Sequence, residues 1–330
     1  MKIRVLGAEE IAEALSMEEA IEIVKEAYVQ LSTGQAQSPL RTMLRLQHPG
    51  EAALVMPGYL EKSQALGAKM VTVIPQNPLR GLPATQALVI LLDAETGQPC
   101  AILEGTLLTR LRTGAAAGLA SQVFSRPESS RLAMFGAGGQ AFHQLLGILA
   151  VRKIHQIRIF DLLPDRVDTL LDMARRVPQT RGLEIGKARS PAEALEGADI
   201  VMTITTSSTP VFDGTLLKEG THINAFGAFR PSMQEVDETT LLRSRIFVDS
   251  IPACLEEAGD LLIPIQKGRL DRSAILGEIG EVICGKVAGR THASDITYFK
   301  SVGNTVQDLS VGRAILERAR AKNLGQVVEL

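Results

Sequence analysis

The sequence lacks tryptophan altogether, and aromatic residues make up only 4% of its 330 residues. It therefore offers few of the aromatic side chains on which proteins stack nucleic-acid bases. Its charges nearly cancel, with 35 basic and 37 acidic residues, so the basic surface typical of nucleic-acid-binding proteins is not expected either. No run of about eighteen apolar residues occurs, which predicts that no segment spans a membrane.

Cysteine and histidine are also scarce. The 3 cysteines are Cys100, Cys254 and Cys284, and the 5 histidines never occur at the spacing of metal ligands. A scattered, odd-numbered set of cysteines predicts reduced thiols rather than a disulfide framework. The histidine spacing predicts no metal site. The first residues, 1–6, form a strand-like stretch without a signal-peptide cleavage pattern, so we expect a cytoplasmic protein.

The spacing of the apolar residues changes along the sequence and divides it into two parts. A capping box at Ser16–Glu19 predicts the start of a helix, and short apolar runs between turn residues then predict an antiparallel sheet over 41–103. An alanine-rich helix is expected over 107–124. From residue 131 onward, strand-like runs alternate with helical patterns, which is typical of a doubly wound parallel sheet, and a last helix is expected over 305–322. The predicted fold class is α/β, with a smaller α+β domain.

The strongest motif follows the predicted strand 131–135. Gly136, Gly138 and Ala141 fit the pattern G-x-G-x-x-A, in which the first glycine permits a tight turn and the second lets the backbone approach a pyrophosphate. The next helix then begins with free N–H groups that favour an anion. Asp161 lies twenty residues after Ala141, where a carboxylate accepts hydrogen bonds from the adenosine ribose and repels a 2′-phosphate. The pattern predicts a Rossmann domain that binds NAD(H) in preference to NADP(H).

Three cations in the first domain are candidates for binding a carboxylate. Arg45 and Lys69 each lie among apolar strand residues, so each projects from one face of a sheet. Arg112 lies near the start of the alanine-rich helix. Each has a structural alternative, because a lone cation in such a place can reach solvent, form an ion pair or cover a helix surface.

Taken together, these features resemble the ornithine cyclodeaminase/mu-crystallin family. The resemblance extends over nearly the whole chain, in order. It is carried by Gly67-Ala-Lys69, Asn77-x3-Gly81-Leu-Pro83, Asp93-Ala-Glu-Thr-Gly97, Leu108-Thr-Arg-Leu-Arg-Thr113, Gly136-Ala-Gly-Gly-Gln-Ala141, His222-Ile-Asn-Ala225 and Ser301-Val-Gly303.

The resemblance implies a two-domain homodimer. Residues 1–118 and 303–330 would form the substrate-binding and dimerisation domain, and residues 119–302 the Rossmann domain that binds NAD(H). The family's shared chemistry is hydride exchange at the α-carbon of a small α-amino or α-imino acid.

The resemblance also implies roles for individual positions. Arg45, Lys69 and Arg112 would bind the substrate carboxylate, and Val302 would close over the substrate. Thr85 would be a cofactor contact, although it lies one residue from the family's threonine because this sequence has Ala84 there. The expected cofactor contacts are Thr85, Arg112, Gly136, Gly138, Gly139, Gln140, Asp161, Thr203, Ala225 and Ser301.

One departure from the family pattern bears on the substrate. Ornithine cyclodeaminases carry an aspartate shortly after His-x-Asn-Ala, where this sequence has Phe229. Phenylalanine cannot accept a proton or pair with an ammonium group, so an ornithine side chain would lose a charge-assisted partner worth about 1.5–3 kcal/mol. An apolar residue here favours a small apolar or cyclic substrate.

We therefore expect an NAD(H)-dependent enzyme that reduces a small α-imino acid, such as Δ1-pyrroline-2-carboxylate, or that acts as an alanine dehydrogenase. Lys69, or a water that it holds, is the expected proton donor, because neighbouring cations lower the pKa of a lysine. Two alternatives stay open at this point. One is an amino-acid cyclodeaminase that releases ammonia, and the other is a non-enzymatic NAD(P)-binding protein of the crystallin type.

Overall fold

The computed structural model describes residues 1–48 and 50–330, which form two compact units. Unit 1 comprises residues 1–113 and 304–330, and unit 2 comprises residues 114–303. These divisions lie close to the boundaries inferred from the sequence. Each unit has its own sheet, and the two ends of the chain meet in unit 1, where the amino group of Met1 donates to the carbonyl of Leu330.

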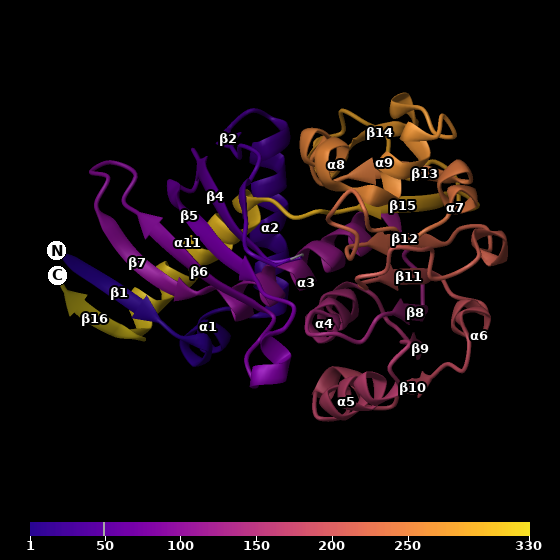
Figure 1. Ribbon diagram of the computed structural model, residues 1–330, viewed down its shortest axis with the longest axis horizontal. Coiled ribbons are helices and arrows are strands. Elements are labelled where there is room, and N and C mark those ends of the chain that lie inside the picture. Colours follow the sequence, from indigo (N-terminus) through magenta and orange to yellow (C-terminus); the bar gives the residue numbers. More distant parts are fainter. Residues whose placement is uncertain (49) are drawn as a thin grey trace. The chain divides into compact units, whose positions relative to one another are not determined.

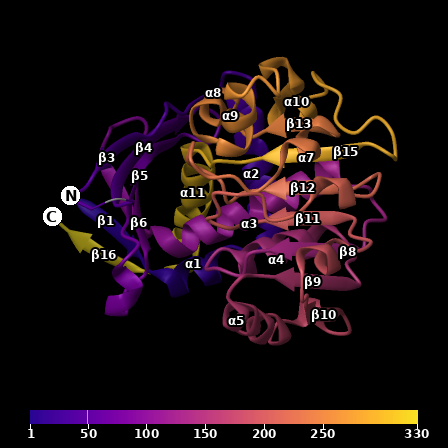
Figure 2. The ribbon, with the colours of Figure 1, turned by 45° about the vertical axis from the view of Figure 1, so that its right-hand side comes forward.

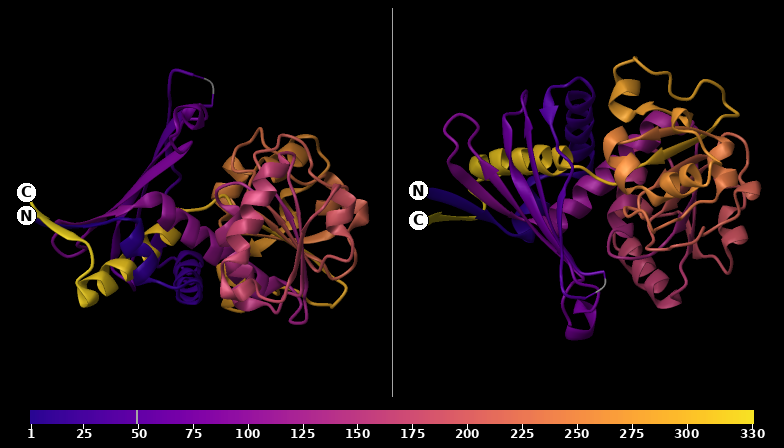
Figure 3. Two further views of the ribbon diagram at one scale, coloured as in Figure 1. Left: turned by 90° about the horizontal axis from the view of Figure 1, so that it is seen from below. Right: turned by 45° about the horizontal axis from the view of Figure 1, so that its top comes forward.

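Unit 1 is built on an eight-stranded sheet in the order β16-β1-β7-β6-β5-β4-β2, with β3 also paired to β4 (Figure 1). The long helices α2 and α11 lie against one face of this sheet (Figure 3), and α11 contacts β4, β5 and β6. The capping box at Ser16 is present, because its hydroxyl accepts from the Glu19 N–H while the Glu19 carboxylate accepts from the Ser16 N–H. The elements are β1 (Lys2–Leu6), α1 (Ala8–Ala14), α2 (Met17–Ser32), β2 (Ala36–Gln37), β3 (Thr42–Arg45), β4 (Ala52–Leu60), β5 (Ala65–Val73), the 3-10 helix η1 (Asn77–Arg80), β6 (Thr85–Leu92), β7 (Pro99–Glu104), the start of α3 (Gly105–Phe124), α11 (Thr305–Lys322) and β16 (Gln326–Glu329).

The expectation of an antiparallel sheet after a single helix was incomplete. Strand β1 comes before two helices and pairs in parallel with β7, and β16 at the other end of the chain pairs antiparallel with β1. The sheet is therefore mixed. Local patterns show strands but not their partners, and this pairing joins opposite ends of the sequence.

Unit 2 is a doubly wound parallel sheet in the order β10-β9-β8-β11-β12-β15-β13-β14 (Figure 2). All of its strand pairs are parallel. From β8 the chain moves outward to β9 and β10, then returns to place β11 on the other side of β8. The elements are β8 (Arg131–Phe135), α4 (Ala141–Val151), β9 (Gln156–Phe160), α5 (Pro164–Arg175), η2 (Pro178–Thr180), β10 (Glu184–Lys187), α6 (Pro191–Leu195), β11 (Ile200–Thr203), η3 (Gly214–Leu216), β12 (His222–Ala225), α7 (Glu238–Leu242), β13 (Ser244–Val248), α8 (Ile251–Glu257), α9 (Gly259–Gln266), η4 (Arg272–Ala274), β14 (Ile275–Glu278), α10 (Ile279–Ile283) and β15 (Ile296–Lys300).

The predicted fold class, a Rossmann-type parallel sheet with a smaller α+β unit, is confirmed. Strand β8 and helix α11 have the predicted bounds. Strands β14 and β15 were not predicted. Strand β15 is wholly buried between β12 and β13, but Thr297 interrupts its apolar residues and Lys300 ends it, so the strand lacks the continuous apolar run that marks a buried strand.

Candidate active site

The glycine turn after β8 has the shape that a dinucleotide requires. Gly136 has φ +100°, and a Cβ added there would lie 2.5 Å from the carbonyl oxygen of Ile204, so no other residue fits. A Cβ added at Gly138 would meet nothing within 4 Å. Open space over Gly138 is the feature that lets a pyrophosphate approach the backbone at the start of α4.

Two further groups of this turn fit a cofactor. The Asp161 carboxylate lies just beyond β9 and accepts from the N–H of Ala137 (2.8 Å) and of Leu163 (2.8 Å). Its position beside the glycine turn is therefore fixed, and its remaining lone pairs suit ribose hydroxyls. The Gln140 side-chain oxygen is buried without a hydrogen-bond partner, although buried polar atoms normally have one. These residues fit a dinucleotide that would supply the missing contacts.

Four of the expected cofactor residues come together at one edge of the parallel sheet. The register aligns the carboxyl ends of β8, β11, β12 and β15, because Phe135, Thr203, Ala225 and Lys300 are paired in succession. This edge includes the point where the strand order reverses between β8 and β11, and open α/β sheets bind their ligands there. The residues brought together are Gly136, Thr203, Ala225 and Ser301.

At this edge, two hydroxyls that the resemblance assigned to the cofactor are bonded to buried carboxylates. Thr203 Oγ1 donates to Glu235 (3.0 Å), and Ser301 Oγ donates to Asp249 (2.7 Å). Sequence reasoning did not find either carboxylate as a site residue. Phe229 is half-buried and packs against the apolar core of unit 2, with the Arg230 guanidinium 5.5 Å from its ring centre, and Val302 is buried.

Unit 1 holds a buried cluster of cations around one carboxylate. Asp308, on α11, accepts from Lys69 Nζ (2.7 Å) and from Arg112 Nε (3.0 Å). Arg112 also donates to the side-chain oxygen of Gln307, whose amide nitrogen donates to the hydroxyl of Tyr28. Lys69, Arg112 and Asp308 are 3%, 7% and 0% exposed, so the structure excludes the alternative that the two cations are solvated surface charges.

Burial lowers the pKa of Lys69 from 10.5 to about 8. The Asp308 carboxylate opposes this shift, and the positive charges of Arg112 and Arg41 add to it. A lysine with this pKa carries a proton in about half of the molecules near pH 8 and can both donate and accept one. The cluster therefore suits a substrate that brings a carboxylate and needs a proton.

Arg41 directly precedes β3, where the strand register, continued by one residue, would reach the cross-strand row of Lys69. Lys69 pairs with Met56 across β4 and β5. Thr42 pairs with Val55, so one further residue of the same antiparallel register would place Arg41 opposite Met56. Sequence reasoning missed Arg41, although the signal was available, because alternation places it on the same strand face as Arg45.

Arg45 belongs to a different row. It pairs with Ala52, whose partner Val73 pairs in turn with Thr85. This row lies four residues along β5 from Lys69, about 13 Å at about 3.3 Å per residue. Arg45 and Thr85 are both exposed. The structure thus brings Arg45 and Thr85 onto one row and keeps both apart from the Lys69 cluster.

Residues 1–48 and 50–330 contain neither a cluster of metal ligands nor a membrane-spanning helix. No group of three or more His, Cys, Asp or Glu side chains there has an arrangement that could hold a metal ion. No helix there combines the length and the apolar character needed to cross a membrane.

A Rossmann-type sheet with a glycine turn and an acid after its second strand, in a chain that also carries a buried cation cluster and is similar to NAD-dependent reductases and dehydrogenases, defines an NAD-dependent oxidoreductase. More specifically, the chain belongs to the ornithine cyclodeaminase/mu-crystallin family, whose model matches residues 1–323. The resemblance noted from the sequence motifs is therefore confirmed, as is the expectation of an enzyme of the imine reductase and amino-acid dehydrogenase type.

Three relatives illustrate the match. A Δ1-pyrroline-2-carboxylate reductase from Bacillus cereus is 36% identical over 98% of this chain and 99% of its own length. The Thermococcus litoralis Δ1-pyrroline-2-carboxylate reductase in complex with NADH and L-proline has a TM-score of 0.93 and 36% identity, over 98% of this chain and 99% of that one. An archaeal alanine dehydrogenase dimer with bound NAD has a TM-score of 0.92 and 33% identity, over 100% of both chains.

Proposed function

We propose that this protein reduces Δ1-pyrroline-2-carboxylate to proline with NADH. The observation that carries the proposal is the buried cluster of Lys69, Arg112 and Asp308, which offers two cations to a carboxylate and one titratable proton. The 36% identity to reductases named for this substrate supports the choice of a cyclic imine.

In this proposal the residues of unit 1 bind and protonate the imino acid. Arg112 and Lys69 hold the carboxylate, and Asp308 keeps both cations in place. The Lys69 ammonium, or a water it binds, gives a proton to the imine nitrogen, which makes the imine carbon more electrophilic. NADH supplies the hydride for that carbon when it is bound. Orientation of the substrate by two fixed cations contributes much of the rate.

We propose that Arg41 is the third cation of this carboxylate site. Its position directly before β3 and its charge, which lowers the pKa of Lys69, support this role, whereas Arg45 lies in the row of Thr85. Arg45 and Thr85 stay candidates for the outer part of the site, and paired variants distinguish the two arginines.

For the cofactor, we propose that Gly136, Gly138, Gly139 and Gln140 hold the pyrophosphate and that Asp161 holds the adenosine ribose. The Asp161 carboxylate favours NAD(H) over NADP(H), because a 2′-phosphate placed beside it would be repelled. Arg158 lies on β9, the strand that Asp161 follows, and pairs with Glu184. Its positive charge is therefore already partly balanced. Thr203, Ala225 and Ser301 complete the edge on the nicotinamide side.

Phe229 favours imine reduction over ornithine cyclisation. Its ring packs on the apolar core and leaves no carboxylate at the position where cyclodeaminases of the family carry one. We propose that it presents an apolar surface to the ring of the substrate.

We further propose a homodimer formed through the sheet of unit 1. On the face opposite α11, the row Val55–Met70–Leu88 and the neighbouring row Ala68–Ile90–Ile102 are apolar. Met70 and Leu88 are 50% and 49% exposed. Contiguous exposed apolar surface marks interaction sites, and the archaeal alanine dehydrogenase is itself a dimer.

A cytoplasmic location also belongs to the proposal. Its support is that Cys100, Cys254 and Cys284 are all free thiols, as expected in a reducing compartment.

The test measures, by absorbance, the rate at which NADH is consumed with each member of a substrate panel. The panel holds Δ1-pyrroline-2-carboxylate, Δ1-piperideine-2-carboxylate, and pyruvate with ammonia. We expect the fastest turnover with the five-membered imine, and we expect Lys69→Met to lose turnover while NADH binding is kept. Faster turnover of pyruvate with ammonia would indicate an alanine dehydrogenase instead. Ammonia release from ornithine with NAD, without turnover of any imine, would indicate a cyclodeaminase.

A further inference from the structure

The Glu235 carboxylate is fully buried and accepts five hydrogen bonds. Its Oε1 accepts from the N–H (2.6 Å) and the hydroxyl (2.9 Å) of Thr205. Its Oε2 accepts from the hydroxyl of Thr203 (3.0 Å) and from the N–H of Gly227 (2.7 Å) and of Ala228 (3.0 Å). Each carboxylate oxygen therefore faces at least one backbone N–H, which can only donate.

These donors belong to the segments that follow two central strands. Thr203 ends β11 and Thr205 lies two residues beyond it, while Gly227 and Ala228 follow β12. The segment after β11 also touches the glycine turn, because a Cβ at Gly136 would lie 2.5 Å from the Ile204 carbonyl oxygen. One carboxylate thus fixes the carboxyl-end segments of β11 and β12 next to the turn that follows β8.

The backbone of Glu235 is also held in place, by Asp260. Its own N–H donates to Asp260 (2.6 Å), and Asp260 also accepts from Lys300 Nζ (2.9 Å) and from the Tyr298 hydroxyl (3.1 Å). Burial raises the pKa of Glu235, and the negative charge of Asp260 adds to this, whereas Lys300 and the donors from Thr205 lower it. The backbone donors at both oxygens favour the ionised carboxylate.

We infer that Glu235 is a positioning residue for the nicotinamide half of NAD(H). Its carboxylate holds the two strand-end segments that form the nicotinamide side of the site, whereas the adenosine half depends on the glycine turn and Asp161. The inference rests on the proposed function for the location of the cofactor. It adds a specific role for a residue that does not itself touch the reacting atoms.

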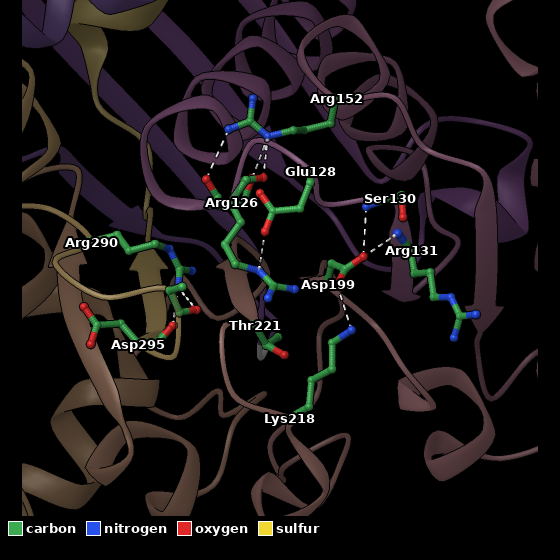
Figure 4. A network of polar contacts seen from close by, with 12 residues as sticks. Arg126, Glu128, Ser130, Arg131, Arg152, Asp199, Lys218, Thr221, Arg290 and Asp295 are labelled. Atoms are coloured by element: carbon green, nitrogen blue, oxygen red, sulfur yellow. Dashed lines mark hydrogen bonds and ion pairs between the residues drawn. The ribbon is translucent and has the colours of Figure 1, made fainter.

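Unit 2 provides a matched control at the opposite edge of the same sheet. Asp199 is 6% exposed and precedes β11, where its Oδ2 accepts from the N–H of Ser130 (2.9 Å) and of Arg131 (3.0 Å). Its Oδ1 accepts from Arg126 and from Lys218 (Figure 4). Asp199 thus also ties strand segments together through backbone N–H groups, but at the amino ends of the strands, away from the edge that binds a cofactor.

The experiment compares Glu235→Gln with Asp199→Asn. In Glu235→Gln, either orientation of the amide points an NH2 group at a backbone N–H, so one strand-end segment must move. Asp199→Asn also replaces a buried carboxylate with an amide, but only Oδ2 of Asp199 faces backbone N–H groups, so the amide can turn its NH2 group toward the side chains of Arg126 and Lys218. For each variant, the measurements are the Kd of NADH from its nicotinamide fluorescence, the Kd of ADP, the thermal midpoint, and kcat with Δ1-pyrroline-2-carboxylate.

We expect Glu235→Gln to weaken NADH about fivefold or more and to lower kcat about tenfold or more, because small misplacements of reacting groups have large effects on rate. ADP binding should stay within about twofold, because ADP lacks the nicotinamide half. Asp199→Asn should lose thermal stability yet keep NADH binding and kcat within about twofold.

Unchanged NADH binding and kcat in Glu235→Gln would overturn the inference. Equal losses of ADP and NADH, or equal losses in Asp199→Asn, would also overturn it, since they indicate a general loss of stability. If Glu235→Gln does not fold, Thr203→Val removes a single hydroxyl from Glu235 and is expected to lower kcat about threefold or more, at unchanged ADP affinity. Wild-type behaviour of Thr203→Val would then refute the role. The two Kd values need no imine, so a wild type that reduces no imine would count against the proposed function and not against this inference.

Discussion

Replacing Asp308 with asparagine removes the carboxylate that Lys69 and Arg112 both contact, at 2.7 Å and 3.0 Å. Two buried cations then lie close together without their shared anion, and an uncompensated buried charge costs about 3–5 kcal/mol. Lys69 can escape this cost by losing its proton, whereas an arginine cannot. The pKa of Lys69, already lowered to about 8 by burial, should therefore fall further.

The size of this change follows from the strength of a close ion pair. An opposite charge at this distance changes a pKa by about 1 to 3, so a pKa near 6 is expected for Lys69 in Asp308→Asn. At pH 8 about half of the wild-type Lys69 carries a proton, against about 1% in the variant. If the ammonium form is needed, kcat/KM at pH 8 should fall about 50-fold from this effect alone.

The assay is the pH profile of kcat/KM for Δ1-pyrroline-2-carboxylate, which reports the ionisation of the free enzyme. In the wild type, activity should decline as pH rises through about 8, because the pKa of Lys69 is about 8 and the ammonium form is lost above it. In Asp308→Asn the decline should begin at lower pH. The ionisation of the imine itself is the same for both proteins, so the difference between the profiles belongs to the enzyme.

Asp199→Asn is the control for loss of a buried carboxylate in the other unit, and its alkaline decline should match the wild type. An alkaline decline at the same pH in Asp308→Asn and in the wild type would refute the role given to Lys69. A uniform drop at every pH would mean that Asp308 acts on substrate position and not on the Lys69 proton.

Three other outcomes are expected. Arg41→Ala should raise KM for the imino acid about tenfold or more, whereas Arg45→Ala should change it less than about threefold. The reverse order would indicate that Arg45, and not Arg41, binds the carboxylate. Asp161→Ser should raise the ratio of kcat/KM with NADPH to that with NADH about tenfold or more, and an unchanged ratio would place cofactor choice elsewhere. Met70→Glu should convert a dimer into a monomer in sedimentation experiments, because it places a charge in an apolar face; a dimer that persists would exclude this face.

Local sequence determined the parts of this protein that depend on neighbouring residues. The turn from Gly136 to Ala141 and the acid Asp161 could be predicted because the spacing of the glycines and the distance along the chain to the acid form one short motif. Strand β8 could be predicted from a short apolar run before a turn. The sequence context of Arg45, Lys69 and Arg112 made them candidates, and the family resemblance then implied that they bind the substrate carboxylate.

Tertiary structure alone decided which residues contact the candidates that the sequence offered. Lys69 meets Asp308 across 239 residues of sequence, and Thr203 meets Glu235 across 32. Strand pairing, which no local pattern records, placed Arg45 in the row of Thr85 and not in that of Lys69. An acid in a helix or a loop looks like a solvated charge until the fold buries it. Burial then requires that its partners be cations or N–H groups, and this physical requirement identifies Asp308 and Glu235.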